Sequence, residues 1–176
     1  TLLDHVEKRI GLVIQKDYKS RHGGVLRKPQ DLEIWKQYSR PEIINFFGLQ
    51  YDPAVHNTGV ITFSKSDPFP EDIIIITKID TSAAHEQYQY INNFEDDAIT
   101  FRWQSQNSNN PQSGVGKRLV TPGMANLHLF VQPKSHTPAV YCGQVKPIRY
   151  ESSNPIDVWF RLPSPVPLES FNALKE

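Results

Sequence analysis

One segment of the chain combines amide, hydroxyl and basic side chains in a pattern suited to nucleic-acid recognition. Residues 99–118 read ITFRWQSQNSNNPQSGVGKR. Amide side chains present a donor and an acceptor together, which allows bidentate hydrogen bonding to the edge of a base. Glycines and small polar residues let backbone N–H groups approach phosphates, and a closing basic pair strengthens such a contact. The candidate DNA-contacting residues of this segment are Arg102, Gln104, Ser105, Gln106, Asn107, Lys117 and Arg118.

The same segment also has a purely structural interpretation. On a strand, Phe101 and Trp103 point to one face while Arg102 and Gln104 point to the other. The Asn and Ser residues that follow could simply satisfy the turns of a long hairpin loop. Both interpretations of the loop stay open, whereas for Trp103 a place in the hydrophobic core is favoured.

The sequence contains no recognisable catalytic signature. The glycines near residues 23 and 114 lack the Lys-Ser/Thr ending of a phosphate-binding loop, and the six histidines are scattered. A metal-dependent nuclease site built from Lys78, Asp80 and Glu86 is conceivable, since phosphodiester hydrolysis uses carboxylates and a metal. The spacing of these three residues is unspecific, so we expect no catalytic site, no metal and no cofactor.

Composition excludes several other classes of protein. The 19 basic and 19 acidic residues cancel, which argues against a strongly basic, tail-like nucleic-acid binder. The charge is unevenly distributed, and Lys19, Arg21 and Lys78 are further candidates for phosphate contacts. A single cysteine excludes a disulfide framework and indicates a reducing compartment, so we expect a cytoplasmic protein. The chain has no apolar run of about 20 residues that would predict a membrane partner, and without a signal peptide before Thr1 it is expected to be an excised domain.

Hydrophobic spacing predicts an α+β domain with a curved, mainly antiparallel sheet or partial barrel behind an N-terminal helical portion. Residues 2–14 show helical spacing, residues 15–30 form a basic loop, and residues 31–38 suggest a short helical turn. Ser39 is a plausible N-cap for a helix with Pro41 in its first turn, which should stop at Gly48. Strands are expected at residues 59–63, 73–79, 99–104, 127–132, 139–145 and 156–162, followed by a short closing helix within residues 163–174.

The order of seven segments resembles a known family. They are YSRPEIINFFGL, IIIITKID, YQYINNF, FRWQSQNSNNPQSGVGKR, LHLFVQ, VYCGQV and VWFRLPSPVPLESFNAL, which span roughly residues 38–174. This order resembles the C-terminal target-recognition domain of SauUSI-like type IV modification-dependent restriction enzymes and related helicase–nuclease fusions. The resemblance implies a PUA-like DNA-recognition domain over residues 38–176. Residues 1–37 match nothing in that family and are expected to form an N-terminal helix and basic loop extension.

The resemblance implies an SRA-related domain that reads modified cytosine, 5-methyl or 5-hydroxymethyl, in double-stranded DNA. It implies nuclease and helicase domains in the same or a partner chain, and a role in bacterial defence. Related readers commonly flip the base into a pocket of aromatic rings and polar groups. The candidate pocket residues are Tyr88, Tyr90, Phe101 and Trp103 for stacking, with Ser64, Thr77 and Asp80 for the polar edge. Tyr90 is preferred, because a tyrosine can stack and also donate a hydrogen bond.

Two other functions stay open at this point. An RNA-binding PUA-like module would use the same sheet with a basic groove. A self-sufficient nuclease would cut DNA with a divalent metal.

Overall fold

The computed structural model describes residues 28–63, 71–79, 92–105, 110–112, 114–151 and 155–175. These residues divide into two compact units. The helical unit contains residues 28–32 and 39–56, and the sheet unit contains residues 33–38 and the described residues from 57 onwards. The expected helix at residues 2–14 and the basic loop after it lie outside the described residues. The predicted domain boundary after residue 37 falls inside the first strand, Gln37–Tyr38.

The helical unit contains η1 (Pro29–Asp31), α2 (Arg40–Phe46) and α3 (Pro53–His56). Helix α2 begins as predicted at Ser39, whose hydroxyl accepts the Glu42 N–H at 3.3 Å while the Glu42 carboxylate accepts the Ser39 N–H at 3.2 Å. The chain leaves this helix with Gly48 in the left-handed conformation at φ +79°. The Arg40 guanidinium donates to the His56 carbonyl over 2.9 Å and so joins α2 to α3.

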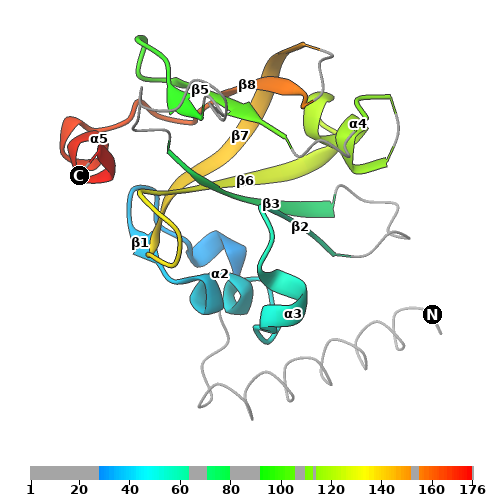
Figure 1. Cartoon of the computed structure of the whole chain (residues 1–176), viewed down its shortest axis with the longest axis vertical. Helices are drawn as coiled ribbons and strands as arrows, with labels where there is room; N and C mark the ends of the chain where they lie inside the picture. Colours follow the sequence, from blue (N-terminus) through cyan, green and yellow to red (C-terminus); the bar gives the residue numbers. More distant parts are fainter. Residues whose placement is uncertain are drawn as a thin grey trace, which may run out of the picture. The chain divides into compact units, whose positions relative to one another are not determined.

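The sheet unit is built on eight strands, which confirms the α+β prediction (Figure 1). All six expected strand regions form strands, although residues 31–38, expected to be helical, contain β1 instead. The strands are β1 (Gln37–Tyr38), β2 (Val60–Thr62), β3 (Glu71–Lys78), β4 (Asn93–Phe94), β5 (Thr100–Gln104), β6 (Ala125–Gln132), β7 (Ala139–Glu151) and β8 (Asp157–Arg161). Their order is β2-β3-β6-β7-β8-β5-β4, and β1 also pairs with β7.

Pairing in this sheet is mainly antiparallel, as expected. The exception is β3 and β6, which run parallel from Glu71 opposite Ala125 to Lys78 opposite Gln132. A parallel pair needs a long crossover connection. Here the chain passes through β4, β5 and helix α4 (Gly114–Val120) before it returns as β6.

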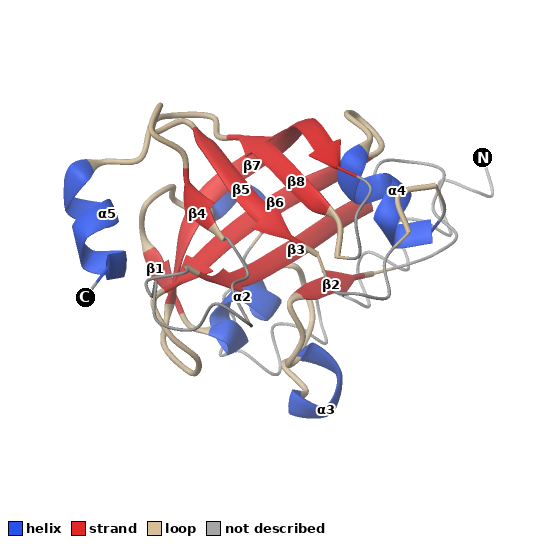
Figure 2. Cartoon of the chain, turned by 45° about the horizontal axis from the view of Figure 1, so that its top comes forward, coloured by secondary structure: helices blue, strands red, loops and turns tan. Residues whose placement is uncertain are grey.

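Strand β7 bends the sheet. Its first half pairs with β6 and its second half pairs with β8, with register shifts between Leu129 and Phe130 and between Pro147 and Arg149. Such bulges kink a strand and increase its twist. Gly143 lies in β7 at φ +99°, and an added Cβ would come within 2.5 Å of the Pro163 ring. The sheet therefore curves around its core (Figure 2).

The hydrophobic core lies on the inner face of the curved sheet. Helices α4 and α5 (Leu168–Lys175) lie at opposite ends of the sheet and contribute Leu119 and Leu174 to the core (Figure 1 and Figure 2). Strand alternation turns Phe101 and Trp103 inward, with 0% and 4% of their surface exposed. The Trp103 and Phe160 rings pack with centroids 5.7 Å apart. None of the described helices is long and apolar enough to cross a membrane.

Candidate nucleic-acid interface

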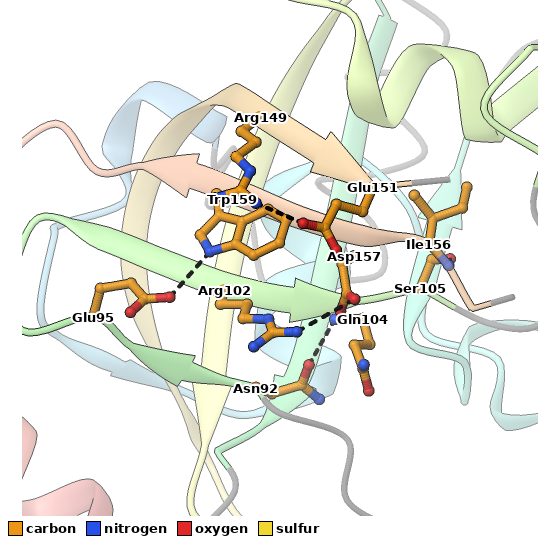
Figure 3. A network of polar contacts seen from close by, with 10 residues as sticks. All are labelled: Asn92, Glu95, Arg102, Gln104, Ser105, Arg149, Glu151, Ile156, Asp157 and Trp159. Atoms are coloured by element: carbon orange, nitrogen blue, oxygen red, sulfur yellow. Dashed lines mark hydrogen bonds and ion pairs between the residues drawn. The ribbon is translucent and has the colours of Figure 1, made fainter. Parts of the chain in front are cut away.

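Three connections of the chain are joined at one end of β5 and β8 (Figure 3). Ser105 follows β5, and its N–H donates to the Ile156 carbonyl at 2.9 Å while its hydroxyl accepts the Ile156 N–H at 3.1 Å. The Gln104 N–H donates to the side-chain oxygen of Asn92 over 2.8 Å. Because Asn92 directly precedes β4 and Ile156 directly precedes β8, these bonds hold the beginnings of two strands to the end of a third.

The joined connections carry many of the residues selected from sequence. Residues 80–91 lead into Asn92, residues 106–113 follow Ser105, and residues 152–154 precede Pro155. In these connections the described residues are the anchoring residues Asn92, Gln104, Ser105 and Ile156, together with residues 110–112 and Pro155. The predicted residues that lie outside the described part are Lys19, Arg21, Ser64, Asp80, Tyr88, Tyr90, Gln106 and Asn107.

The basic pair that closes the polar segment was expected to follow a glycine-rich loop. The structure places both basic residues in helix α4 instead. Lys117 is exposed, whereas Arg118 forms an ion pair with Glu71 of β3. Only 19% of the Arg118 side chain and 9% of the Glu71 side chain are exposed, so water screens this pair weakly. Lys117 is therefore better placed for a phosphate contact, because the guanidinium of Arg118 is already paired with a carboxylate.

Two of the predicted pocket aromatics are core residues. Phe101 is fully buried and Trp103 nearly so, as the fold requires of inward-facing residues on β5. This placement agrees with the core position favoured for Trp103 and argues against stacking of either ring on a base. Thr77 and Lys78 lie at the end of β3, where Thr77 is 7% exposed and Lys78 is exposed. These two residues belong to the β2-β3-β6 part of the sheet rather than to the β8-β5-β4 part.

On the outer face of the sheet, Trp159 of β8 stands between two arginines (Figure 3). Arg102 of β5 and Arg149 of β7 lie directly opposite Trp159 in the register of the two flanking strands. The guanidinium carbons lie 5.0 Å and 4.3 Å from the centroid of the indole, a cation–π geometry. The indole N–H donates to the Glu95 carboxylate over 3.0 Å. Sequence reasoning missed this stack, because its three members come from three separate strands.

Arg102 and Asp157 form an ion pair with unused hydrogen-bonding capacity. Arg102 Nη2 lies 3.3 Å from Asp157 Oδ2, and the side chains are 25% and 10% exposed. Within the described part of the chain, the buried Arg102 Nε and Asp157 Oδ1 have no hydrogen-bond partner. Buried polar atoms are rarely left without a hydrogen bond, because each such group costs about 1–3 kcal/mol of folding stability.

A second polar cluster, missed from sequence, is buried between β3, β6 and β7. His128 Nε2 lies 2.9 Å from Asp72 Oδ1, and His128 Nδ1 lies 3.0 Å from the Tyr141 hydroxyl. Burial, together with the charge of Asp72, raises the pKa of Tyr141. Because only 1% of His128 is exposed, we interpret this cluster as structural. Among the described residues, no three His, Cys, Asp or Glu side chains are grouped in a way that could hold a metal ion.

The comparison with protein families decides where the chain belongs. Residues 32–174 match the family described as a domain of unknown function, DUF3427. This chain is a member of that family. The match covers both the helical unit and the sheet unit, including Asn92, Gln104 and Trp159. It names no restriction enzyme, so the SauUSI-like assignment stays a prediction.

Two solved structures are similar to this DUF3427 chain at low identity. One is the SRA domain of SUVH5, crystallised with fully methylated CG DNA, at 11% identity and a TM-score of 0.49 over 82% of this chain and 98% of that chain. The other is SUVH9, at 10% identity and a TM-score of 0.38 over 96% of this chain and 38% of that chain. No curated protein matches the sequence significantly.

Proposed function

We propose that this DUF3427 domain is a non-catalytic recognition module that reads modified cytosine in double-stranded DNA. The observation that carries the proposal is the hydrogen bond between Asn92 and the backbone of Gln104. This bond joins the end of residues 80–91, which contain the tyrosines of the predicted base pocket, to the start of residues 106–113, which are predicted to read neighbouring bases. Successive bases along one strand of B-DNA are only about 3.4 Å apart. A pocket and a readout loop that serve adjacent bases must therefore start from neighbouring points of the fold.

Each part of the proposed site has a separate task. Tyr88 and Tyr90 are the remaining candidates for stacking on the base, since Phe101 and Trp103 are buried. Asp80 and Ser64 are the proposed partners of the polar edge of the base, because an aspartate can accept the cytosine amino group. Thr77 is a weaker candidate for that edge, because little of its surface is accessible.

Readout and positioning fall to other residues. Gln104, Gln106 and Asn107, with Ser105 as their anchor, are proposed to contact the edges of neighbouring bases. The proposed phosphate contacts are Lys19, Arg21, Lys78 and Lys117, with Arg102 and Arg118 sharing their guanidinium groups between a phosphate and their carboxylate partners Asp157 and Glu71. Phosphate contacts set the register of a protein on DNA, whereas base contacts provide specificity.

The resemblance to SauUSI-like enzymes supports a wider biological context. In that context the domain serves nuclease and helicase domains in the same or a partner chain and directs them to modified DNA. Flipping of the base into the pocket fits the chemistry, because only an extruded cytosine exposes its Watson–Crick edge to hydrogen bonds and both ring faces to stacking, whereas in the duplex the 5-methyl group is reached only from the major groove.

The test is a binding titration with matched duplexes that differ only in cytosine modification: none, 5-methyl or 5-hydroxymethyl. We expect tighter binding to at least one modified duplex at a fixed salt concentration. Equal affinity for all three duplexes would contradict the proposal, and tighter binding to an RNA of the same sequence would favour the RNA-binding alternative. Incubation of plasmid with the protein and magnesium or manganese should leave the DNA uncut. Nicking that disappears in an Asp80 or Glu86 variant would instead indicate a nuclease.

A further inference from the structure

The outer face of β7, β8 and β5 carries a basic surface that the proposed base contacts do not explain. Strand alternation places one row of side chains, Arg149, Trp159 and Arg102, across the three strands. The next row contains Lys146 of β7 and Arg161 of β8 on the same face. We call these five residues the basic face.

Lys146 and Arg161 lie directly opposite each other, and both are exposed. Like charges at directly opposed positions of a sheet are destabilising. Within the described part of the chain, neither residue forms an ion pair with a carboxylate. The carboxylates near this face have partners already: Glu95 accepts from Trp159, Glu151 pairs with Arg149, and Asp157 pairs with Arg102. Asp97 accepts from Thr100, and the nearby charge of Arg161 also helps to lower the pKa of Asp97, so Arg161 is partly compensated and Lys146 is the less compensated of the two facing cations. This pair of facing cations favours an anionic partner.

Trp159 gives the basic face rigidity. The indole is half-buried, its N–H donates to Glu95, and the guanidinium groups of Arg102 and Arg149 from the two flanking strands lie within 5.0 Å of its centroid. A guanidinium stacked on an aromatic ring still has its N–H groups at the edge for a phosphate. Because 62% of the Arg149 side chain is exposed, this guanidinium remains accessible to a ligand. Ordering it in advance lowers the entropy cost of binding.

We propose that the basic face contacts the phosphate backbone of the DNA that the domain reads. This inference rests on the proposed function and adds the surface that holds the backbone. Arg102 lies two residues, about 7 Å along β5, from Gln104, where the predicted readout loop begins. A duplex whose bases are read from this end of β5 therefore has its backbone next to Arg102 and Trp159. Phosphate is the part of DNA that matches a surface of guanidinium and ammonium groups.

The experiment uses the whole chain with Lys146→Ala and Arg161→Ala, singly and together. Both side chains are exposed, so the variants should fold like the parent. Fluorescence anisotropy would measure affinity for methylated and unmodified duplexes at several salt concentrations. We expect each variant to weaken binding to both duplexes by about fivefold. We also expect each to reduce the salt dependence by about one phosphate contact.

Lys134→Ala is the matched control, because Lys134 is an exposed lysine in the connection between β6 and β7. Equal losses of DNA affinity in Lys134→Ala and in Lys146→Ala would overturn the proposal, since the removal of any surface cation would then have the same effect. Parent-like affinity of Lys146→Ala and Arg161→Ala, with DNA binding intact in the parent, would overturn it while leaving the proposed function in place. Failure of the parent to bind any duplex would contradict both the proposed function and the proposed role of the basic face.

Trp159→Phe and Trp159→Ala test the stack itself. The phenylalanine keeps a ring between the two arginines but loses the hydrogen bond to Glu95, so we expect a smaller loss of affinity than for alanine. Melting temperatures would be compared first. If Trp159→Ala melts like the parent and also binds like the parent, the stack does not order the basic face for phosphate and that part of the proposal is wrong. If Trp159→Ala unfolds, the affinities of Lys146→Ala and Arg161→Ala decide whether the basic face binds phosphate.

Discussion

Gly116 of α4 packs directly against the backbone of Asn110: an added Cβ at residue 116 would lie 2.0 Å from the Asn110 carbonyl oxygen. Asn110 belongs to the polar segment between β5 and α4, and it is the first of the described residues 110–112. The absence of a side chain at residue 116 is therefore what allows the helix and the polar segment to lie so close together.

Gly116→Ala is expected to displace this segment. Overpacking of this kind costs about 1–3 kcal/mol of folding stability, and the shift should also weaken DNA binding if the segment contacts DNA. Urea denaturation and a binding titration would measure the two effects. Gly48→Ala is a useful control, because Gly48 has a positive φ with open space around it and lies in the helical unit. The control should lose stability without losing affinity; equal binding losses would mean that destabilisation alone is responsible.

Asn92→Ala should reduce discrimination between modified and unmodified duplexes. The change removes the oxygen that accepts the Gln104 N–H and releases the end of residues 80–91 from the end of β5. Loss of one such hydrogen bond costs about 0.5–1.5 kcal/mol of stability. Asn92→Asp keeps an acceptor at the same place and should retain most of the discrimination. The measurement is the ratio of the two dissociation constants at one salt concentration, and an unchanged ratio in Asn92→Ala would contradict the role of this anchor.

Tyr90→Ala tests the predicted base pocket. We expect the preference for methylated DNA to fall while nonspecific binding and its salt dependence stay as in the parent, because stacking on one base involves no phosphate. Tyr90→Phe separates the ring from the hydroxyl and should keep the stacking contribution. Equal discrimination by Tyr90→Ala and the parent, at matched melting temperatures, would remove Tyr90 from the pocket.

Replacement of Gln104 or Gln106 by Ala should relax the preference for particular bases beside the modified one. A good bidentate amide contact provides about 1–3 kcal/mol of discrimination against the wrong base. Binding to a set of duplexes with altered flanking bases would measure the change. Lys117→Ala should instead weaken binding to all of these duplexes by the same factor. A selective effect of Lys117→Ala would show that Lys117 reads bases and does not simply contact phosphate.

Tyr141→Phe should destabilise the sheet unit without affecting DNA recognition. The Tyr141 hydroxyl lies 3.0 Å from Nδ1 of the buried His128, and its loss leaves that nitrogen without this partner. The expected cost is about 1–3 kcal/mol. Urea denaturation would measure it, and a native-like dissociation constant below the transition would confirm a structural role.

Cys142, the single cysteine of the chain, should not react with thiol reagents in the folded protein. Its side chain is fully buried, and burial raises the pKa of the thiol, so little of the reactive thiolate forms at neutral pH. Labelling with a chromogenic disulfide should become rapid only in denaturant. Rapid labelling of the native protein would mean that β7 opens readily.

Local signals determined a good part of this fold from the sequence alone. Ser39, Pro41 and Gly48 predicted the start and stop of α2 because capping depends on residues within one turn. Alternation along β5 predicted that Phe101 and Trp103 share a face, since the side-chain period of a strand is two. The six expected strand regions followed from the same kind of short-range pattern.

Helix α4 was missed because its sequence, GVGKRLV, contains two glycines and has low intrinsic helix propensity. It forms in a tertiary setting that buries Leu119 and Val120 and brings Gly116 against Asn110. Burial and close packing of this kind depend on residues far from the helix in the chain.

Only the tertiary structure decided which residues act together. The parallel pairing of β3 with β6, the buried His128 cluster and the Arg149–Trp159–Arg102 row all depend on strand order and register. Register is set by how the inner faces of the strands bury their side chains together, and a shift of one residue would turn Trp159 inward. No short stretch of sequence contains that information, because the partners of Trp159 lie 57 residues before it and 10 residues before it along the chain, on two different strands.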